Sequence, residues 1–147
     1  EFADDYFDII YENSALHHLD LNTAYSELAR VLAPEGEILC IEALGHNPLI
    51  NYYRRKTAYL RTEWEIKHIL RKKDIVSAKA YFKNVDILGF FHLADIAAVP
   101  FRNTRGFSFA LKTLGALDYL LLKVPVLKWQ AWQAVFTLSG PIKQLKK

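Results

Sequence analysis

Two adjacent histidines are the first candidates for chemistry in this sequence. His17 and His18 stand between Glu12 and Asp20, so imidazole and carboxylate groups lie close together along the chain. Such a set could bind a metal ion, could act as a general base, or could simply mark the turn that leads into a helix. The elements around the pair decide among these roles.

A metal site is the least supported of the three interpretations. Zinc needs further ligands, and no cysteine or His-x3-His spacing accompanies His17 and His18. Adjacent residues are also expected to direct their side chains to different sides of the chain. We therefore predict no metal at this pair.

The residues around the histidines predict a strand, a helix and a second strand. FDIIYE at 7–12 is a short apolar run rich in β-branched and aromatic residues, as expected for a buried strand. Asp20 or Asn22 can cap a helix over 22–32, where apolar residues recur at helical spacing before the turn formers of APEG. EILCIEA at 37–43 is predicted to be the second buried strand. Together they form a βαβ unit with parallel strands.

The rest of the chain predicts further helices and two more strands. We expect helical segments at about 48–59, 62–80 (as one helix or two) and 107–123, and strands at about 85–93 and 129–139. Asn47 is a candidate cap for the first of these helices, and Thr62 with Glu65 is a candidate capping box for the second. An apolar helix such as 107–123 usually belongs to the core.

Composition places the chain among globular proteins. The 147 residues are 52% hydrophobic, and the net charge of +3 is too small for the dense basic face of a nucleic-acid-binding protein. The single Cys40 rules out an internal disulfide framework and favours a cytoplasmic location. No stretch has the length of a transmembrane segment or the pattern of a secretion signal. The chain begins EFADDYFDII without methionine, so we expect a portion of a longer gene product.

The stretch FDIIYENSALHHLDLNTAYSELARVLAPEGEILCIEAL resembles the second half of a class I S-adenosylmethionine-dependent methyltransferase, of the group that acts on small molecules. That group has FD and two apolar residues, a polar loop, LHHL, and ELARVLKPGG before the next strand. The matching residues, in order, are Phe7, Asp8, Leu16, His17, His18, Leu19, Leu28, Arg30, Val31, Leu32, Pro34 and Gly36. Glu35 stands where the pattern has glycine, which affects only a turn.

The resemblance implies the fold class α/β: a doubly wound, Rossmann-like methyltransferase sheet, incomplete, with about four strands, the last one antiparallel, and helices on both faces. Residues 1–147 would be the carboxyl-terminal portion of one methyltransferase domain, with a helical insert at about 46–80. The family's glycine-rich cofactor loop has no counterpart, since the chain has no Gly-x-Gly. We therefore expect the fragment alone to be inactive. The alternative is a non-catalytic, methyltransferase-like interaction module.

The resemblance also implies a site for the cofactor S-adenosylmethionine. Ligands of open α/β sheets bind beyond the carboxyl ends of the strands, so the loop after FDIIYE would border the methionine end of the cofactor. Glu12, Asn13 and Ser14 are the candidate cofactor-binding residues. His17 or His18 could be catalytic and take a proton from an acceptor hydroxyl, or could pack locally and line the cleft. Because the sulfonium is already activated, the reaction requires little further catalysis.

The acceptor is expected to be a small molecule, and the apolar helices favour a lipid-like or quinone-like one. Tyr52 or Tyr53 could stack on it and Arg54 could bind a carboxylate or phosphate, with a solvated helix face as the alternative. His92 is a further candidate substrate-binding residue, or else a packed histidine. The helix at 107–123, flanked by lysines, could also make a peripheral contact with a membrane surface.

Overall fold

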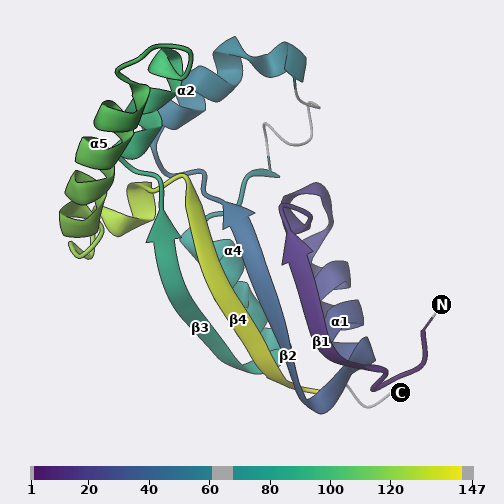
Figure 1. The fold of residues 1–147 in the computed structure, drawn as a ribbon. Coiled ribbons are helices and arrows are strands. Elements are labelled where there is room, and N and C mark those ends of the chain that lie inside the picture. Colours follow the sequence, from purple (N-terminus) through teal and green to yellow (C-terminus); the bar gives the residue numbers. More distant parts are fainter. Residues whose placement is uncertain (1, 61–67, 144–147) are drawn as a thin grey trace.

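A computed structural model describes residues 2–60 and 68–143 and shows one four-stranded sheet (Figure 1). Its strands are β1 (Phe7–Asn13), β2 (Leu32–Ala43), β3 (Phe82–Phe91) and β4 (Gln133–Pro141). Their spatial order is β1-β2-β4-β3, so the strand that comes last in the sequence lies inside the sheet. β4 therefore joins the βαβ unit to β3.

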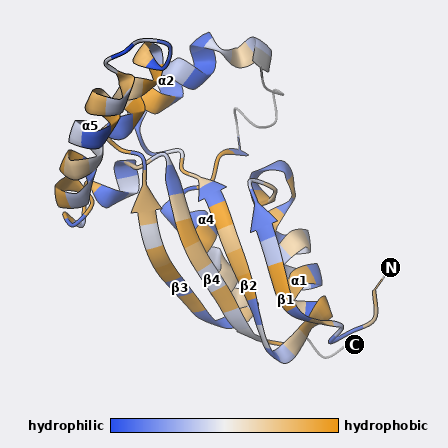
Figure 2. Ribbon diagram, in the orientation of Figure 1, coloured by the Kyte–Doolittle hydropathy of each residue, from blue (hydrophilic) through white to orange (hydrophobic). Residues whose placement is uncertain are grey.

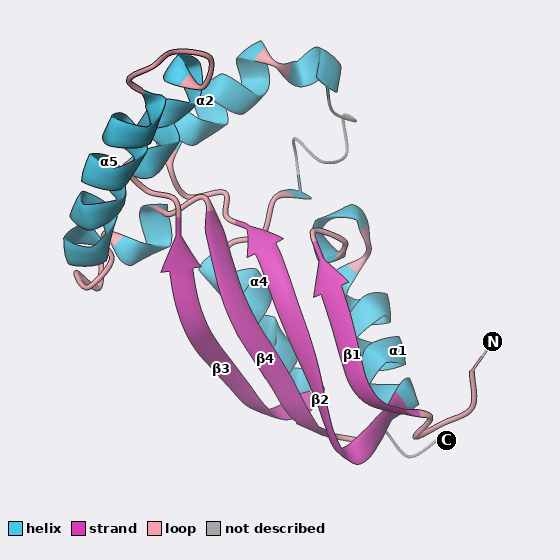
Figure 3. Cartoon of the chain, in the orientation of Figure 1, coloured by secondary structure: helices cyan, strands magenta, loops and turns pink. Residues whose placement is uncertain are grey.

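Strand directions agree with the expected topology. β1 and β2 are parallel, with Ile10 paired to Ile38, whereas β4 runs antiparallel to both of its neighbours. The expectation of an α/β, Rossmann-like sheet with an antiparallel last strand is confirmed. Figure 3 shows that β1, β2 and β3 all end on the side of the sheet where β4 begins.

Helix α1 (Leu21–Val31) connects the two parallel strands. Its cap is Asp20 rather than Asn22, because the Asp20 carboxylate accepts a hydrogen bond of 2.9 Å from the backbone N–H of Thr23. Tyr25 and Ala29 lie one turn apart and are buried against the sheet. The stripe predicted from the sequence contains Ala24 and Leu28 instead, which are half-buried against the same core.

The core lies between one face of the sheet and the helices α1 and α4 (Lys72–Ser77). In Figure 2 hydrophobic and hydrophilic colours are interspersed along the strands. The buried core residues of largest volume are Tyr25, Phe82, Phe136, Leu16, Leu32, Ile38, Leu44, Leu70, Ile75 and Leu138. Ile9 and Tyr11 of β1 point the other way and are exposed, so the opposite face of that strand is uncovered in the described part of the chain.

Helix α2 (Pro48–Lys56) starts where the sequence predicts it. The Asn47 side chain accepts hydrogen bonds from the backbone N–H groups of Leu49 and Ile50, and Pro48 occupies the first helical position. The helix ends at Lys56, slightly before the expected residue 59, and a 3-10 turn follows at Ala58–Leu60. α2 lies beyond the carboxyl ends of the parallel strands (Figure 1).

The sequence predicts helical periodicity along the whole segment 62–80, and the structure differs from this prediction. Thr62 and Glu65, the expected capping box, lie outside the described residues. The prediction of a helix through Leu70 is wrong, because Leu70 forms an isolated parallel bridge with Leu44. Helix α4 begins only at Lys72 and continues as a 3-10 turn at Ala78–Ala80. The bridge attaches this segment to the end of β2.

Helix α5 (Phe107–Leu121) forms where the sequence predicts a helix, but its expected place in the core is wrong. Of its side chains only Asp118 is buried, while Phe109 is 77% and Leu120 is 61% exposed. α5 lies at the outside of the molecule, beside the end of β3 (Figures 1 and 2). Within the described residues, no helix has the length and apolar character needed to cross a membrane.

Candidate functional site

The candidate site lies at the end of the sheet where β1, β2 and β3 finish. At this end β4 begins where the other three strands finish, and α2 and α5 stand beyond it (Figure 3). Open α/β sheets bind their ligands here, because the loops that follow parallel strands splay apart and leave a crevice. Two groups of polar residues occupy the end, one at β1 and β2, the other at β3.

The first group is organised around Glu42, a fully buried carboxylate on β2. One of its oxygens accepts a 2.6 Å hydrogen bond from the backbone N–H of Leu16, and the other lies 2.7 Å from Nδ1 of His17. His17 is itself buried, so this contact is shielded from water. Glu42 therefore fixes the loop after β1 to the neighbouring strand.

Glu12, at the end of β1, stands beside this pair. Its Oε2 accepts a hydrogen bond of 3.0 Å from the backbone N–H of Ala15, whereas its buried Oε1 has no hydrogen-bond partner in the described part of the chain. Burial, followed by the negative charge of Glu42, raises the pKa of Glu12 to about 8. Below that pH Glu12 is a neutral acid, which can donate as well as accept a hydrogen bond.

Asn13 and Ser14 complete the turn after β1. Ser14 has a left-handed backbone with φ of 58°, a conformation that costs a non-glycine residue roughly 1 kcal/mol or more. The turn is held because the Ser14 N–H donates to the carbonyl of Ile41 at 2.8 Å and its hydroxyl donates to Asn13 at 3.2 Å. Asn13 is exposed at the strand end. A role of Glu12, Asn13 and Ser14 in cofactor binding stays a prediction.

His17 and His18 lie together in a 3-10 turn at Leu16–His18. Their ring centroids are 4.2 Å apart, so the expectation that adjacent side chains diverge is wrong in this tight turn. His17 is buried against Glu42, and His18 is exposed. Among the described residues no group of three or more histidine, cysteine or acidic side chains could hold a metal ion. The catalytic role of either histidine stays a prediction.

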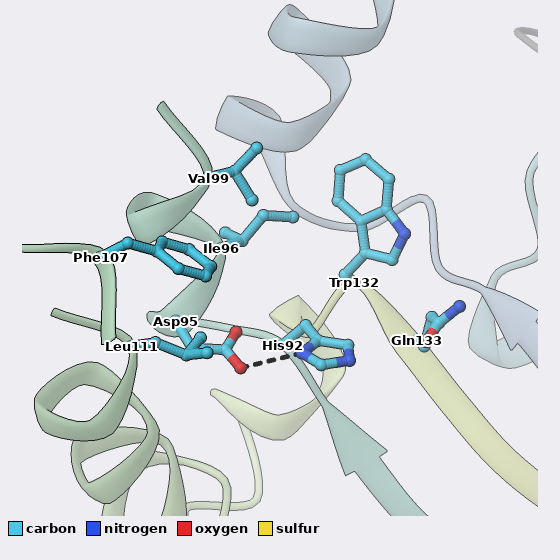
Figure 4. Close-up of a pocket in the computed structure, with 8 residues that line it drawn as sticks. All are labelled: His92, Asp95, Ile96, Val99, Phe107, Leu111, Trp132 and Gln133. Atoms are coloured by element: carbon cyan, nitrogen blue, oxygen red, sulfur yellow. Dashed lines mark hydrogen bonds and ion pairs between the residues drawn. The ribbon is translucent and has the colours of Figure 1, made fainter. Parts of the chain in front are cut away.

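The second group lies at the end of β3 and contains His92. The sequence left open a packed histidine here, but His92 is exposed and has a left-handed φ of 63°. Its Nδ1 lies 2.9 Å from the carboxylate of Asp95 (Figure 4). The residues between them are held by the buried Asp118 of α5, whose carboxylate accepts hydrogen bonds from the backbone N–H groups of Leu93 and Ala94.

A cavity of about 360 Å³ opens beside His92 and Asp95. Its walls are largely apolar and come from β4, from α5 and from the 3-10 helix Asp95–Phe101 (Figure 4). The residues that line it are His92, Asp95, Ile96, Val99, Phe107, Leu111, Trp132 and Gln133. A cavity of this size suits a small organic molecule.

Two residues of helix α2 lie beside Trp132, which lines this cavity. The guanidinium of Arg54 lies 4.6 Å from the centre of the indole, and the Tyr53 ring lies 6.4 Å from it. Arg54 is buried and donates to the carbonyl of Leu44 at 2.8 Å, so it does not extend into solvent as the sequence would allow. Tyr52 is exposed on another side of α2, beside Lys56. The structure brings Tyr53, Arg54 and His92 together around one indole, and leaves Tyr52 apart.

Comparison with known proteins identifies the fold. Residues 1–40 match a family described as a methyltransferase domain. Phosphoethanolamine N-methyltransferase 2 of Haemonchus contortus superposes with a TM-score of 0.55 and 14% identity, over 97% of this chain and 35% of that one. Geranyl diphosphate C-methyltransferase from Streptomyces coelicolor A3(2) gives a TM-score of 0.52 and 14% identity, over 95% of this chain and 48% of that one.

The chain has part of a Rossmann-like methyltransferase fold. The expected resemblance to methyltransferases is supported over residues 1–40 by sequence and over nearly the whole chain by fold. The chain spans between 35% and 48% of the length of these two solved relatives. No curated protein matches it by sequence.

Several residues of the candidate site were not predicted from the sequence. Glu42 carried a signal, because an acidic residue inside the apolar run EILCIEA must find a partner if the strand is buried. Asp118 likewise interrupts an apolar helix. Asp95 and Trp132 carried none, since only the tertiary fold brings them beside His92.

Proposed function

We propose that this chain is part of an S-adenosylmethionine-dependent methyltransferase that acts on a small-molecule acceptor. The match of residues 1–40 to a methyltransferase domain is the observation that carries the proposal, since those residues include β1 and the loop after it, at the end of the sheet where ligands of this fold class bind. The chain would supply the carboxyl-terminal portion of one domain, 1–147, with the segment 46–80 as an insert. A cytoplasmic location is part of the same proposal.

The residues beside β1 suit a cationic cofactor. When bound, S-adenosylmethionine supplies a methyl group on an activated sulfonium. The negative charge of the fully buried Glu42 favours a positively charged ligand, and Glu12, a neutral acid below about pH 8, offers beside it a buried oxygen that has no partner in the described part of the chain. Glu12, Asn13 and Ser14 would hold the cofactor, and His18, which is exposed, could accept a proton from the acceptor.

Cofactor binding provides the test. S-adenosylhomocysteine would be titrated calorimetrically into the full-length protein and, separately, into the 147-residue chain. We expect binding to the full-length protein and little or none to the chain alone, because a glycine-rich loop is absent from its sequence. Micromolar binding to the chain alone would contradict the expectation that the fragment is inactive. Failure of the full-length protein to bind would overturn the proposed function.

A non-catalytic interaction module is the second candidate. It is favoured by the exposed Ile9 and Tyr11 on one face of β1, since uncovered apolar strands invite pairing with another chain. Such a module would form a complex through β1 and would bind no cofactor in any form of the protein. The same titration on the full-length protein therefore separates the two candidates.

The surface of α5 supports a lipid-like or quinone-like acceptor and a peripheral membrane contact. Phe109, Tyr119 and Leu120 are exposed on it. Every charged residue between 99 and 128 except the buried Asp118 is basic. These basic residues are Arg102, Arg105, Lys112, Lys123 and Lys128. Apolar side chains within a basic rim are typical of surfaces that bind anionic lipid.

Vesicle sedimentation tests the membrane contact. We expect the protein to sediment with vesicles that contain phosphatidylglycerol more strongly than with phosphatidylcholine alone, and to lose this binding in a Phe109→Ser, Leu120→Ser double variant. Leu88→Ser, which changes an exposed apolar residue of β3, is the matched control. Equal binding by the double variant and the control would contradict a contact through α5.

A further inference from the structure

We propose that the cavity beside His92 binds a small, neutral, mainly apolar molecule through one hydroxyl group, which donates a hydrogen bond to His92. The inference rests on the proposed function, in which this molecule is the methyl acceptor. The cavity walls define the hydrocarbon part of the ligand, and the imidazole defines its polar group.

The walls select an apolar ligand. Ile96, Val99, Phe107, Leu111 and Trp132 surround the cavity of about 360 Å³, which is in the range that binds small organic molecules. His92 and Asp95 present polar groups together on one side of the cavity, and Gln133 and the indole nitrogen of Trp132 are polar groups elsewhere in the lining (Figure 4). A ligand would therefore bury its hydrocarbon part among the walls and turn one polar group toward that side.

The charges of the lining disfavour an anion. Among the described residues no lysine or arginine lines the cavity, and the carboxylate of Asp95 contributes negative charge. Arg54, which the sequence offered as a partner for a carboxylate or phosphate, lies over the indole of Trp132 and donates to the carbonyl of Leu44. Its contribution is to hold the indole in place rather than to meet a ligand. A neutral ligand fits this lining best.

The imidazole of His92 is arranged to accept a hydrogen bond. A carboxylate can only accept, so the 2.9 Å contact with Asp95 places a proton on Nδ1. In the neutral ring the opposite nitrogen, Nε2, then carries the free lone pair. The contact with Asp95 uses Nδ1 and leaves Nε2 for a donor, and His92 is half-exposed and lines the cavity. A hydroxyl group is the simplest donor that also belongs to a neutral ligand.

Hydrogen bonds to Asp118 and Trp132 hold the backbone around His92 and Asp95 in place. The buried Asp118 accepts hydrogen bonds from Leu93 and Ala94, and so holds the turn that carries Asp95. The carbonyl of His92 accepts from the N–H of Trp132 at 2.9 Å, which stabilises the left-handed backbone of His92. Non-glycine residues persist in this conformation only where the surroundings impose it, and such positions cluster at ligand sites. The binding geometry therefore exists before the ligand arrives.

Calorimetric binding of two matched probes to the full-length protein tests the inference. The probes are para-propylphenol, which has a hydroxyl donor, and para-propylanisole, in which a methyl ether replaces it. We expect the phenol to bind about tenfold more tightly or better, because only the phenol can donate to Nε2 of His92. His92→Phe should abolish this preference, and His46→Gln, which changes a histidine outside the cavity lining, should retain it.

A second variant keeps the test decisive if His92→Phe does not fold. Leu111→Trp adds volume at a partly exposed position of α5 that lines the cavity, and should weaken both probes without changing His92. Equal affinity of the wild-type protein for the two probes would overturn the inference. So would a phenol preference that survives His92→Phe, or unchanged binding of both probes to Leu111→Trp.

Methyl transfer from labelled S-adenosylmethionine separates this inference from the proposed function. If the phenol binds with the expected preference but the protein transfers no methyl group to any acceptor, the proposed function fails and the hydroxyl site stands. If methyl transfer occurs and neither His92→Phe nor Leu111→Trp affects it, the function stands and the assignment of the acceptor to this cavity fails.

Discussion

Two histidines of this chain each face a carboxylate at nearly the same distance, yet their surroundings differ. His17 lies 2.7 Å from Glu42, and the side chains are 7% and 0% exposed. His92 lies 2.9 Å from Asp95, and the side chains are 51% and 15% exposed. The chemistry of the two contacts is the same, so burial decides what each can do. The first pair stabilises a loop, whereas the second can present an imidazole nitrogen to a ligand.

The two pairs also lie at opposite edges of the sheet. β1 and β3 are separated by β2 and β4, and three strand spacings amount to about 14 Å. Both pairs nevertheless lie at the end of the sheet where ligands of this fold class bind. A reaction between two substrates needs two neighbouring places, one for the donor and one for the acceptor. Because direct methyl transfer cannot span about 14 Å, an acceptor whose hydroxyl is held at His92 would present another of its atoms to a cofactor near Glu12.

The largest effect is expected from Glu42→Ala. The substitution leaves the Leu16 N–H and the His17 ring without their partner inside the protein, so the free energy of unfolding should fall by about 3 to 5 kcal/mol. Urea denaturation measures this change. Glu37→Ala, an exposed acidic residue of the same strand, is the control and should change stability by less than about 0.5 kcal/mol. Similar losses in both variants would contradict a special role for the buried pair.

A smaller loss is expected from Asp118→Ala, which removes the acceptor behind the exposed pair. The backbone N–H groups of Leu93, Ala94 and Asp95 lose their acceptor, so we expect a decrease of about 1 to 3 kcal/mol in the free energy of unfolding. The affinity for para-propylphenol should fall with it, because the turn that carries Asp95 is released. A variant that binds the phenol as tightly as the wild-type protein would show that the exposed pair needs no support from α5.

Glu12→Gln should alter how stability depends on pH. The pKa of Glu12 is about 8 in the folded protein and near 4.5 in the unfolded chain, so the folded state holds the proton more tightly. Its stabilising contribution is complete below pH 4.5 and is lost as the pH rises toward 8. A glutamine side chain has no such proton, and the variant should therefore lose less thermal stability between about pH 5 and pH 8. Parallel slopes of melting temperature against pH would contradict a raised pKa.

The smallest effect on stability is expected from Asp95→Asn. The exposed pair with His92 is screened by water, so the free energy of unfolding should change by less than about 1 kcal/mol. Denaturation in urea, run beside Glu42→Ala, gives the direct comparison of the two pairs. A loss as large as that of Glu42→Ala would mean that the His92 pair also holds the fold together, and would remove the distinction drawn between them.

Local signals in the sequence predicted much of the fold. Asn47 with Pro48 marked the start of α2, and the apolar period of 22–32 marked the buried side of α1, because caps and amphipathic stripes are set by nearby residues. Leu70 was misjudged because a single bridge to Leu44, distant in sequence, overrides helical periodicity. The apolar composition of α5 predicted a helix but not its exposure, which depends on what packs against it.

The candidate site was predictable only in part. The resemblance placed Glu12, Asn13 and Ser14 at a strand end, and the structure has them there. The sequence offered Arg54 and His92 as separate candidates, and nothing in it indicated that Trp132 would join them, since they lie on different elements. Contacts of this kind depend on strand order, which local patterns do not contain.

The place of β4 inside the sheet has a consequence for how the chain folds. Cys40 of β2 pairs with Phe136 of β4, and Ile87 of β3 pairs with the same residue. Both strands therefore pair with a strand that is synthesised after them. Sheets built on such distant pairings fold slowly, because a long loop must close before any contact compensates for the lost entropy. Until β4 emerges from the ribosome, the edges of β2 and β3 stay unpaired and prone to aggregation. We expect chains truncated before Gln133 to be degraded or captured by chaperones during synthesis.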